Sequence, residues 1–413
     1  MSDRTPGHAL DVVLLADRTP PAIGGRESVL REILRRQPPE RTRLVAAQAS
    51  GAGSFDRACP VPIHRRPQLA MLGEGGARWL RRTHLHWILR RRPPGMIVAF
   101  GLAGEGSLAL ETKRATGAPY VLHLEGPELH AARRDLRAAG ERARQVQEIL
   151  DESESIFVAS RACRLEAYKA GVLPHRLEVI LPGVDLERFC PGPKPESLAK
   201  RHGLSRGPVL LTVAGRGPAK DPDTVLRAFA AVRAQKNGAA LLVLGPADAV
   251  WRSRAAELRA QAGVVFAGTV SEDALPDYYR LADLFVLAHR ESHEAGVVAG
   301  VEVAFAEALA SGLPIVATRA GSAEELVPSE EVGFLVEAEA HAKMARAALD
   351  VLRTAELHEE LRRAARQRAV EEHAADVRGA RFRELLEVVY YRRLSRGRLA
   401  HEEEPQPAAR PAA

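Results

Sequence analysis

The sequence predicts an α/β protein in which two doubly wound parallel sheets face a central cleft. Short apolar runs of strand length alternate with amphipathic stretches, a pattern typical of parallel strands joined by crossover helices. The alternation stops in a segment rich in proline and glycine, residues 181–208, and then starts again. Because ligands of such sheets bind beyond the carboxyl ends of the strands, the loops at those ends are where we expect the chemistry.

The first half has the pattern of one complete doubly wound unit. Its apolar runs predict strands at residues 11–16, 43–47, 96–100, 119–124 and 155–159. Its amphipathic stretches predict helices at residues 25–36, 77–92, 107–116 and 130–150. We therefore expect a first domain over residues 1–190.

The second half repeats this arrangement. Strands are expected at residues 209–214, 240–244, 264–267, 284–288 and 314–318. Helices are expected at residues 222–235, 251–262, 272–281, 303–310 and 340–353. The second domain then covers residues 191–373, a last long helix covers 374–398, and the acidic, Pro- and Ala-rich tail 399–413 is expected to be disordered.

The composition excludes several classes of protein. With 413 residues, 46% hydrophobic and 27% charged, the chain is globular rather than fibrous or disordered. Three scattered cysteines form neither a disulfide framework nor a zinc motif, and a net charge of +6 is too mild to indicate nucleic acid as a partner. No apolar run approaches the roughly 18 residues of a membrane span, and the N-terminus lacks a signal-peptide core, so we expect a cytoplasmic protein.

Two loops of the first half hold candidate site residues. Gly24 and Gly25 follow a strand and open a helix, where glycine lets a backbone approach a ligand and the helix N-terminus favours an anion. The alternative is a simple tight turn. His123 ends the strand at 119–124 and can accept or relay a proton near neutral pH; the alternative is a structural histidine bonded to backbone.

Charged residues stand out in the corresponding loops of the second half. Arg216 and Lys220 lie four residues apart in a glycine-bearing loop after a strand, which suits a pyrophosphate, although two exposed cations would give the same pattern. Glu307, on a predicted helix, can accept two hydrogen bonds from a ribose diol. Taken alone, Glu307 is better explained as a solvated helix glutamate.

Together these residues give the chain a resemblance to glycosyltransferase family 4, the retaining GT-B enzymes that use nucleotide sugars. The most specific part is residues 266–318, and residues 182–185 are similar to the family's interdomain segment. The resemblance implies two Rossmann-like domains, with the last helix crossing back to brace the first. It also implies that Gly24 and Gly25 approach the donor phosphate and sugar, and that His123 lies near the transferred sugar and the acceptor.

The resemblance implies roles in the second half as well. Arg216 and Lys220 resemble the pair that binds the donor diphosphate, and Glu307 resembles the carboxylate that binds ribose. Where the family usually has a further glutamate, this chain has Ala299. Three nearby carboxylates are candidates to contact the sugar in its place: Glu291, Glu294 and Glu302.

The function expected from this resemblance is the transfer of a hexose-type sugar, with retention, from a nucleoside diphosphate sugar to a hydroxyl acceptor. Cell-envelope, exopolysaccharide or glycoconjugate synthesis would use such a step. We expect no cofactor, because the nucleotide sugar is a co-substrate, and no metal, because no Asp-x-Asp pair ends a strand. The alternatives are a degenerate nucleotide-sugar binding or regulatory module, and a GT-B epimerase of nucleotide sugars.

The acceptor is expected to be a glycan, a lipid-linked sugar or a small molecule, read by the variable loops 48–67 and 125–136. The predicted helix 77–92 mixes Trp79 and Trp87 with several arginines, a combination that can rest on an anionic bilayer. The alternative is a core-packed helix with a basic outer face. Peripheral contact with the inner membrane surface is therefore an open expectation.

Overall fold

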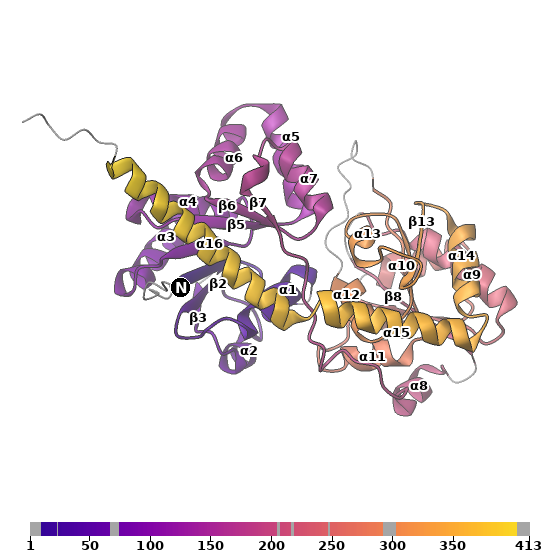
Figure 1. Cartoon of the computed structure of the whole chain (residues 1–413). Coiled ribbons are helices and arrows are strands. Elements are labelled where there is room, and N and C mark those ends of the chain that lie inside the picture. Colours follow the sequence, from indigo (N-terminus) through magenta and orange to yellow (C-terminus); the bar gives the residue numbers. More distant parts are fainter. Residues whose placement is uncertain are drawn as a thin grey trace, which may run out of the picture.

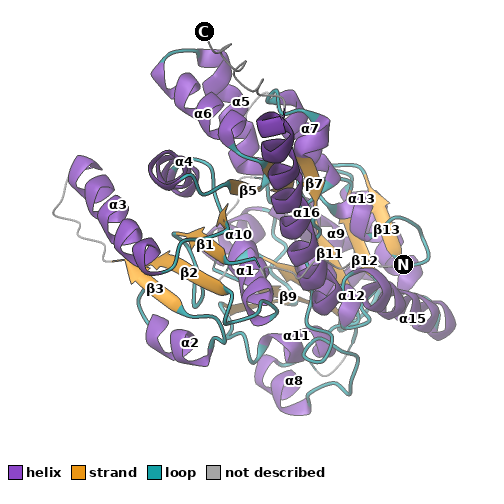
Figure 2. Cartoon of the chain, turned by 60° about the vertical axis from the view of Figure 1, so that its left-hand side comes forward, coloured by secondary structure: helices purple, strands orange, loops and turns teal. Residues whose placement is uncertain are grey.

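The computed structural model describes residues 10–22, 24–66, 74–204, 207–215, 219–246, 248–291 and 303–402. Within these residues the chain forms two separate, wholly parallel sheets, one of seven strands and one of six. Helices lie on both sides of each sheet (Figures 1 and 2). The expected α/β fold with two doubly wound units is confirmed.

The first sheet has the strand order β3-β2-β1-β4-β5-β6-β7. The direction in which successive strands are added reverses between β1 and β4, and such a reversal is where doubly wound folds bind their ligands. The strands are β1 (Val12–Ala16), β2 (Thr42–Ala47), β3 (Ile63–Arg66), β4 (Met96–Ala99), β5 (Tyr120–Leu124), β6 (Ser155–Val158) and β7 (Leu177–Val179).

Two apolar layers sandwich this sheet, so its strands read as continuous apolar runs. One layer contains helices that connect strands β3 to β7: α3 (Glu74–Arg91), α4 (Gly104–Thr116), α5 (Gly126–Ala138), α6 (Glu141–Glu152) and α7 (Arg161–Lys169). The opposite layer contains α1 (Gly25–Arg35), α2 (Ala52–Ala58) and the long α16 (Ala375–Glu402).

The second sheet has the order β10-β9-β8-β11-β12-β13, with its reversal between β8 and β11. Its strands are β8 (Val209–Val213), β9 (Ala240–Leu244), β10 (Val264–Gly268), β11 (Leu284–Leu287), β12 (Ile315–Thr318) and β13 (Gly333–Val336). One apolar layer holds α8 (Glu196–His202), α11 (Leu275–Leu281), α12 (Val303–Ala310), α13 (Ala323–Leu326) and α15 (Ala355–Glu372). The other holds α9 (Pro222–Gln235), α10 (Asp248–Glu257) and α14 (His341–Val351).

The chain crosses between the two sheets twice, and the two crossings pair with each other. Val184 N–H donates to His373 O over 2.8 Å, and Ala375 N–H donates to Val184 O over 2.9 Å. A Cβ at Gly183 would stand 2.7 Å from the Ala375 Cα, so only glycine fits there. After the second crossing α16 returns to the first sheet (Figure 1), where Phe382 packs edge-on against Phe157.

Several expected boundaries differ from the observed ones. The single helix expected at 130–150 is wrong, because the chain forms α5 and α6 with a break at Ala139 and Gly140, whose φ angles are +57° and +92°. Helix α16 continues to Glu402, so residues 399–402 are helical rather than part of the tail; residues 403–413 lie outside the described residues. The domain limits 1–190 and 191–373 remain our proposed division.

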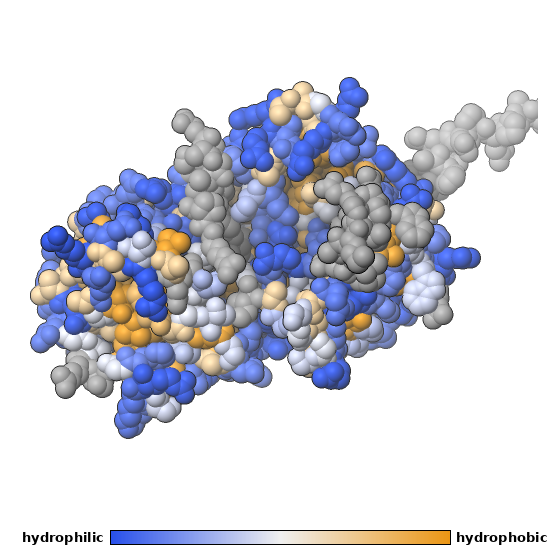
Figure 3. Space-filling model, turned by 180° about the vertical axis from the view of Figure 1, so that it is seen from behind, coloured by the Kyte–Doolittle hydropathy of each residue, from blue (hydrophilic) through white to orange (hydrophobic). Residues whose placement is uncertain are grey.

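The face of the molecule drawn in Figure 3 is largely hydrophilic. Seen from behind, Figure 3 shows polar residues over both halves, with hydrophobic residues in separate smaller areas.

Candidate donor and acceptor site

The loop that follows β8 lies at the reversal of the second sheet and holds Lys220. A Cβ on Gly215 would stand 3.0 Å from Lys220 Cε, so the lysine stem lies directly over the glycine backbone. The loop is tied to the segment after β11, because Arg290 N–H donates to Ala219 O over 2.7 Å and Lys220 forms a β-bridge with His289. Arg216, the other half of the expected cation pair, lies outside the described residues.

Helix α9 begins directly after Lys220. The Asp221 carboxylate caps it, accepting hydrogen bonds from the Thr224 backbone N–H over 3.2 Å and the Thr224 hydroxyl over 2.7 Å, and Pro222 occupies the first turn. The positive end of this 14-residue helix thus lies at the carboxyl edge of the sheet beside the lysine. Both features favour an anion at the same place.

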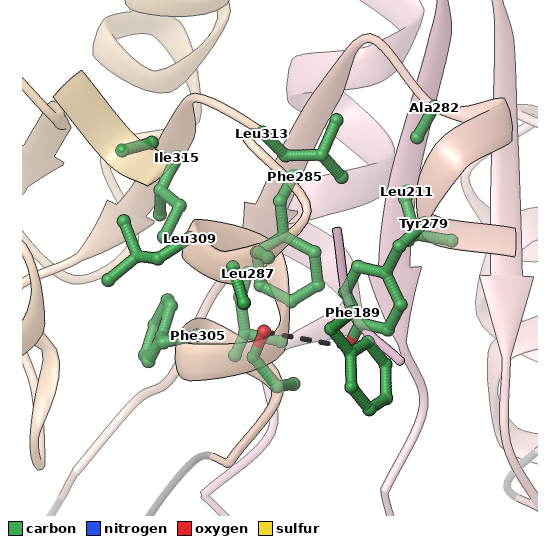
Figure 4. Close-up of a cluster of buried hydrophobic side chains, with 14 of the residues drawn as sticks. Phe189, Leu211, Tyr279, Ala282, Phe285, Leu287, Phe305, Leu309, Leu313 and Ile315 are labelled. Carbon is green, nitrogen blue, oxygen red and sulfur yellow. Dashed lines mark hydrogen bonds between the residues drawn. The ribbon is translucent and has the colours of Figure 1, made fainter. Parts of the chain in front are cut away.

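Glu307 lies on α12 and is buried, not solvated. The Tyr279 hydroxyl donates a hydrogen bond to Glu307 Oε2 over 2.7 Å. Figure 4 shows Tyr279 packed among Phe189, Phe285 and other apolar side chains of this core. Burial raises the pKa of Glu307 to about 7, and the Tyr279 hydrogen bond opposes that rise only in part. The helix-surface alternative for Glu307 is therefore wrong.

The neighbours of Glu307 come from both halves of the chain. Its pKa responds to Glu272 and Arg188 and also to Glu32 on α1. Arg31 of α1 forms an ion pair with Glu272, and Arg188 reaches the same carboxylate at 3.5 Å. Glu307 therefore lies close to the contact between α1 and α12, which joins the two sheets.

In the first half, Gly24 and Gly25 lie at the start of α1, where the loop after β1 ends. A Cβ on Gly24 would stand 2.3 Å from Glu27 Oε2, so a side chain here would have to displace the Glu27 carboxylate. Glu27 is itself buried and pairs with Arg18 over 2.9 Å. The turn is thus packed from within by its own helix, and its backbone is the part left to meet a ligand.

His123 lies one residue before the end of β5 in a buried position, stacked on Phe100 with ring centroids 4.8 Å apart. Burial, reinforced by the Arg26 cation, lowers its pKa to about 3. The imidazole is therefore neutral at physiological pH, and the expectation that it relays protons near neutrality is not supported. Its Nε2 atom is buried without a hydrogen-bond partner among the described residues, which leaves it able to bond a ligand.

The structure brings an unexpected charged cluster to the same edge. Arg26 pairs with Glu128 at 2.9 Å and with Glu125 at 3.7 Å. Burial opposes the charge of Arg26, but the carboxylates of Glu128, Glu125 and Glu105 outweigh it and raise the pKa of Arg26. The run His-Leu-Glu-Gly-Pro-Glu was visible in the sequence, but its link to Arg26, about a hundred positions away, was not.

Of the three candidate sugar-contacting carboxylates, Glu291 lies within the described residues. Glu291 lies two residues after His289, whose backbone N–H donates to the Thr318 hydroxyl over 2.7 Å. This bond fixes the segment at the reversal between β8 and β11. Glu294, Glu302 and Ala299 lie outside the described residues.

No group of three or more His, Cys, Asp or Glu side chains in the described ranges is placed to hold a metal ion. Among the helices described, none combines the length and apolar character needed to cross a bilayer.

Comparisons with known proteins identify the family. The family "Glycosyl transferases group 1" matches residues 195–368, which contain the second sheet. A GDP-mannose-dependent alpha-(1-6)-phosphatidylinositol monomannoside mannosyltransferase of Mycobacterium tuberculosis is 30% identical over 357 residues, covering 83% of this chain and 89% of the relative. A D-inositol 3-phosphate glycosyltransferase of Salinispora arenicola is 31% identical over 323 residues, covering 67% of this chain and 70% of the relative.

Solved structures with a similar fold match most of the chain. Anabaena Alr3699/HepE in complex with UDP and glucose matches with a TM-score of 0.77 at 18% identity, covering 92% of this chain and 99% of that chain. Sucrose-phosphate synthase from Thermosynechococcus elongatus matches with a TM-score of 0.70 at 16% identity, covering 92% and 99%. The chain belongs to the group 1 glycosyl transferases and has their GT-B fold. It is a hexosyltransferase that uses nucleotide-sugar donors, as the resemblance implied.

Proposed function

We propose that this protein transfers a mannosyl residue from GDP-mannose, with retention of configuration, to a hydroxyl group of an inositol-bearing glycolipid. The position of Lys220, over a glycine at the reversal of the donor sheet and beside the start of α9, carries the proposal for the donor. The named activity of the Mycobacterium tuberculosis relative supports the choice of sugar and acceptor. Named relatives are transferases, which favours transfer over a binding module or an epimerase.

Charge neutralisation is the main catalytic effect in this proposal. When the bond between the sugar C1 and the phosphate oxygen breaks, the electron pair leaves with the diphosphate. Lys220, Arg216 and the positive end of α9 stabilise that charge, and one such preorganised group typically contributes about 3–4 kcal/mol to a transition state. The acceptor oxygen bonds to C1 on the face that the diphosphate leaves, and its proton passes to a departing phosphate oxygen.

The other site residues position the donor. Glu307 binds the ribose diol, while the backbone at Gly24 and Gly25 approaches the phosphate and the sugar. His123, neutral and with a free Nε2, bonds a sugar hydroxyl rather than moving a proton. One of the carboxylates Glu291, Glu294 and Glu302 takes the sugar-contacting place that Ala299 leaves. Because the cations neutralise the leaving group, we propose that transfer needs no metal.

A glycolipid acceptor requires contact with a membrane surface. Helix α3 packs Leu85, Ile88 and Leu89 into the core, while Trp87 is 56% exposed and Arg90 is exposed beside it. One face of α3 thus packs into the core, and its outer face, which carries Trp87 and Arg90, can meet acidic lipid. We propose peripheral association with the inner membrane surface through this face.

The test is a transfer assay with purified protein, radiolabelled GDP-mannose or UDP-glucose, and a phosphatidylinositol mannoside. We expect product from GDP-mannose with the anomeric configuration retained, and a loss of about 100-fold or more in kcat for Lys220→Ala. Lys200→Ala, on the exposed face of α8, is the matched control and should match the wild type. Full turnover by Lys220→Ala, or an inverted product, contradicts the proposal.

A further inference from the structure

A cavity of about 420 Å³ lies on the far side of the first half from the site, between α3, α16 and the segments that enter β4 and β5. This volume is within the usual range for small-molecule sites. Most of its wall is apolar, contributed by Leu89, Pro93, Pro94, Ala118, Pro119, Tyr390 and Leu394. It is thus an apolar hollow rather than a water-filled polar one.

Cations surround this hollow. The side chains of His86 and Arg90 from α3 and Arg393 from α16 contribute to its lining. Arg393 also pairs with Glu154 at 3.5 Å, and Glu154 shares a second cation, Lys113, at 3.7 Å. Asp11 pairs with Arg41 and Arg92. An apolar hollow with cations at its rim is complementary to an amphiphile that carries a negative head group.

Large apolar side chains are exposed beside the hollow. Tyr391 and Leu394 on α16 are 48% and 41% exposed, and Trp87 on α3 is the exposed aromatic named above. Aromatic and apolar residues interleaved with arginine are typical of surfaces that lie at the headgroup level of a bilayer. Both helices that line the cavity therefore present membrane-compatible residues outward.

The cavity is separate from the transfer site. Gly95 and Pro119 on its wall precede β4 and β5, whereas His123 lies near the other end of β5. A five-residue strand spans about 17 Å. A ligand in this hollow therefore binds without touching the donor or the reacting hydroxyl.

We propose that the hollow between α3 and α16 binds one acidic phospholipid of the membrane, with an acyl chain in the cavity and the phosphate between Arg90 and Arg393. This inference rests on the proposed function only because both use α3 to meet the membrane. The bound lipid anchors the enzyme and takes no part in the transfer.

The test is flotation of the full chain with two kinds of vesicle. One is phosphatidylcholine alone, and the other is phosphatidylcholine with about 30% phosphatidylglycerol, which supplies the acidic head groups. We expect binding only with the acidic lipid, weakened about tenfold by Arg90→Glu and by Leu394→Glu, which puts a carboxylate at the cavity. Arg144→Glu, exposed on α6, is the control with the same charge change and should bind as the wild type.

Three outcomes would overturn the inference: equal binding to both vesicles, equal weakening by Arg144→Glu, or a shift to dimers in light scattering that Arg90→Glu abolishes, which would make the face an interface between copies. Transfer to a water-soluble inositol acceptor is measured in parallel. If Leu394→Glu, on α16 and outside the α3 face, lowers vesicle binding but leaves that transfer unchanged, the lipid site stands apart from the proposed function. If the wild type binds acidic vesicles but shows no transfer to the soluble acceptor, only the proposed function fails.

Discussion

Tyr279 donates its hydroxyl hydrogen to the Glu307 carboxylate over 2.7 Å, and both side chains are buried at the junction of the two sheets. Burial raises the pKa of Glu307 to about 7, although the hydrogen bond stabilises the ionised form. The residue that we propose binds ribose is therefore only about half ionised at neutral pH in the free protein. A ribose diol that donates to it favours the ionised form.

This coupling predicts that donor binding depends on pH. A carboxylate that accepts from the ribose must lose its proton first, so affinity for GDP should rise as the pH increases from 6 to 8 and level off above. In Glu307→Gln the affinity should be lower and nearly independent of pH over this range. Calorimetric titration at several pH values measures both. A pH-independent wild type would show that Glu307 does not bind the nucleotide as an anion.

The same carboxyl group affects stability in the opposite direction. Its pKa is raised from 4.5 to about 7 on folding, so between these values the native state binds more protons than the unfolded state. The free energy of unfolding should therefore fall as the pH rises from 4.5 to 7, by up to about 3 kcal/mol from this group. Comparing urea unfolding of the wild type and Glu307→Gln isolates this contribution. Identical pH profiles would refute it.

The paired crossings predict a specific intolerance at Gly183. Its missing Cβ is what lets the Ala375 backbone approach, so Gly183→Ala should destabilise the protein by about 1–3 kcal/mol and lower transfer by loosening the contact between the sheets. Gly53→Ala is the control, because that helical position has room and alanine favours a helix. Thermal unfolding measures both variants. A Gly183→Ala protein as stable as the wild type would mean that the crossings separate without cost.

If Lys220 and Arg216 stabilise the leaving diphosphate in place of a metal ion, removal of metal ions by a chelator should not stop transfer. We expect the initial rate in excess EDTA to equal the rate with added Mg²⁺ or Mn²⁺, because Lys220 and Arg216 carry the charge that a divalent ion otherwise supplies. Radiolabel transfer with and without chelator gives the answer. A rate that collapses in EDTA and returns with Mn²⁺ would show that the leaving diphosphate needs a metal.

The sequence predicted strands best where both faces are buried. The runs 209–214 and 240–244 match β8 and β9 closely, since buried parallel strands are continuously apolar. Helix α15 was missed because its buried positions are Leu361, Ala365 and Ala369, and two alanines among charged residues leave little hydrophobic signal. Helix α7 was missed because it buries Glu166 and exposes Tyr168, which inverts the usual pattern.

The candidate site residues could be predicted where the evidence lies close in the sequence, and not where it depends on distant contacts. The spacing of Lys220 from its glycines is local, and the sequence was enough to nominate it. The burial of Glu307 depends on Tyr279 from another helix, and the neutrality of His123 depends on Phe100 and Arg26. Such contacts join positions far apart in the chain. A single sequence therefore identifies the residues but does not show whether their side chains are ionised.

We propose that Lys220 binds the diphosphate of the donor, and one comparison of affinities tests this contact most directly. GDP and GMP share base and ribose and differ by one phosphate, so the ratio of their dissociation constants reports the diphosphate contacts alone. We predict that GDP binds the wild type more tightly than GMP, and that Lys220→Ala reduces this preference about tenfold or more while leaving GMP binding nearly unchanged. An unchanged ratio in Lys220→Ala would contradict the claim.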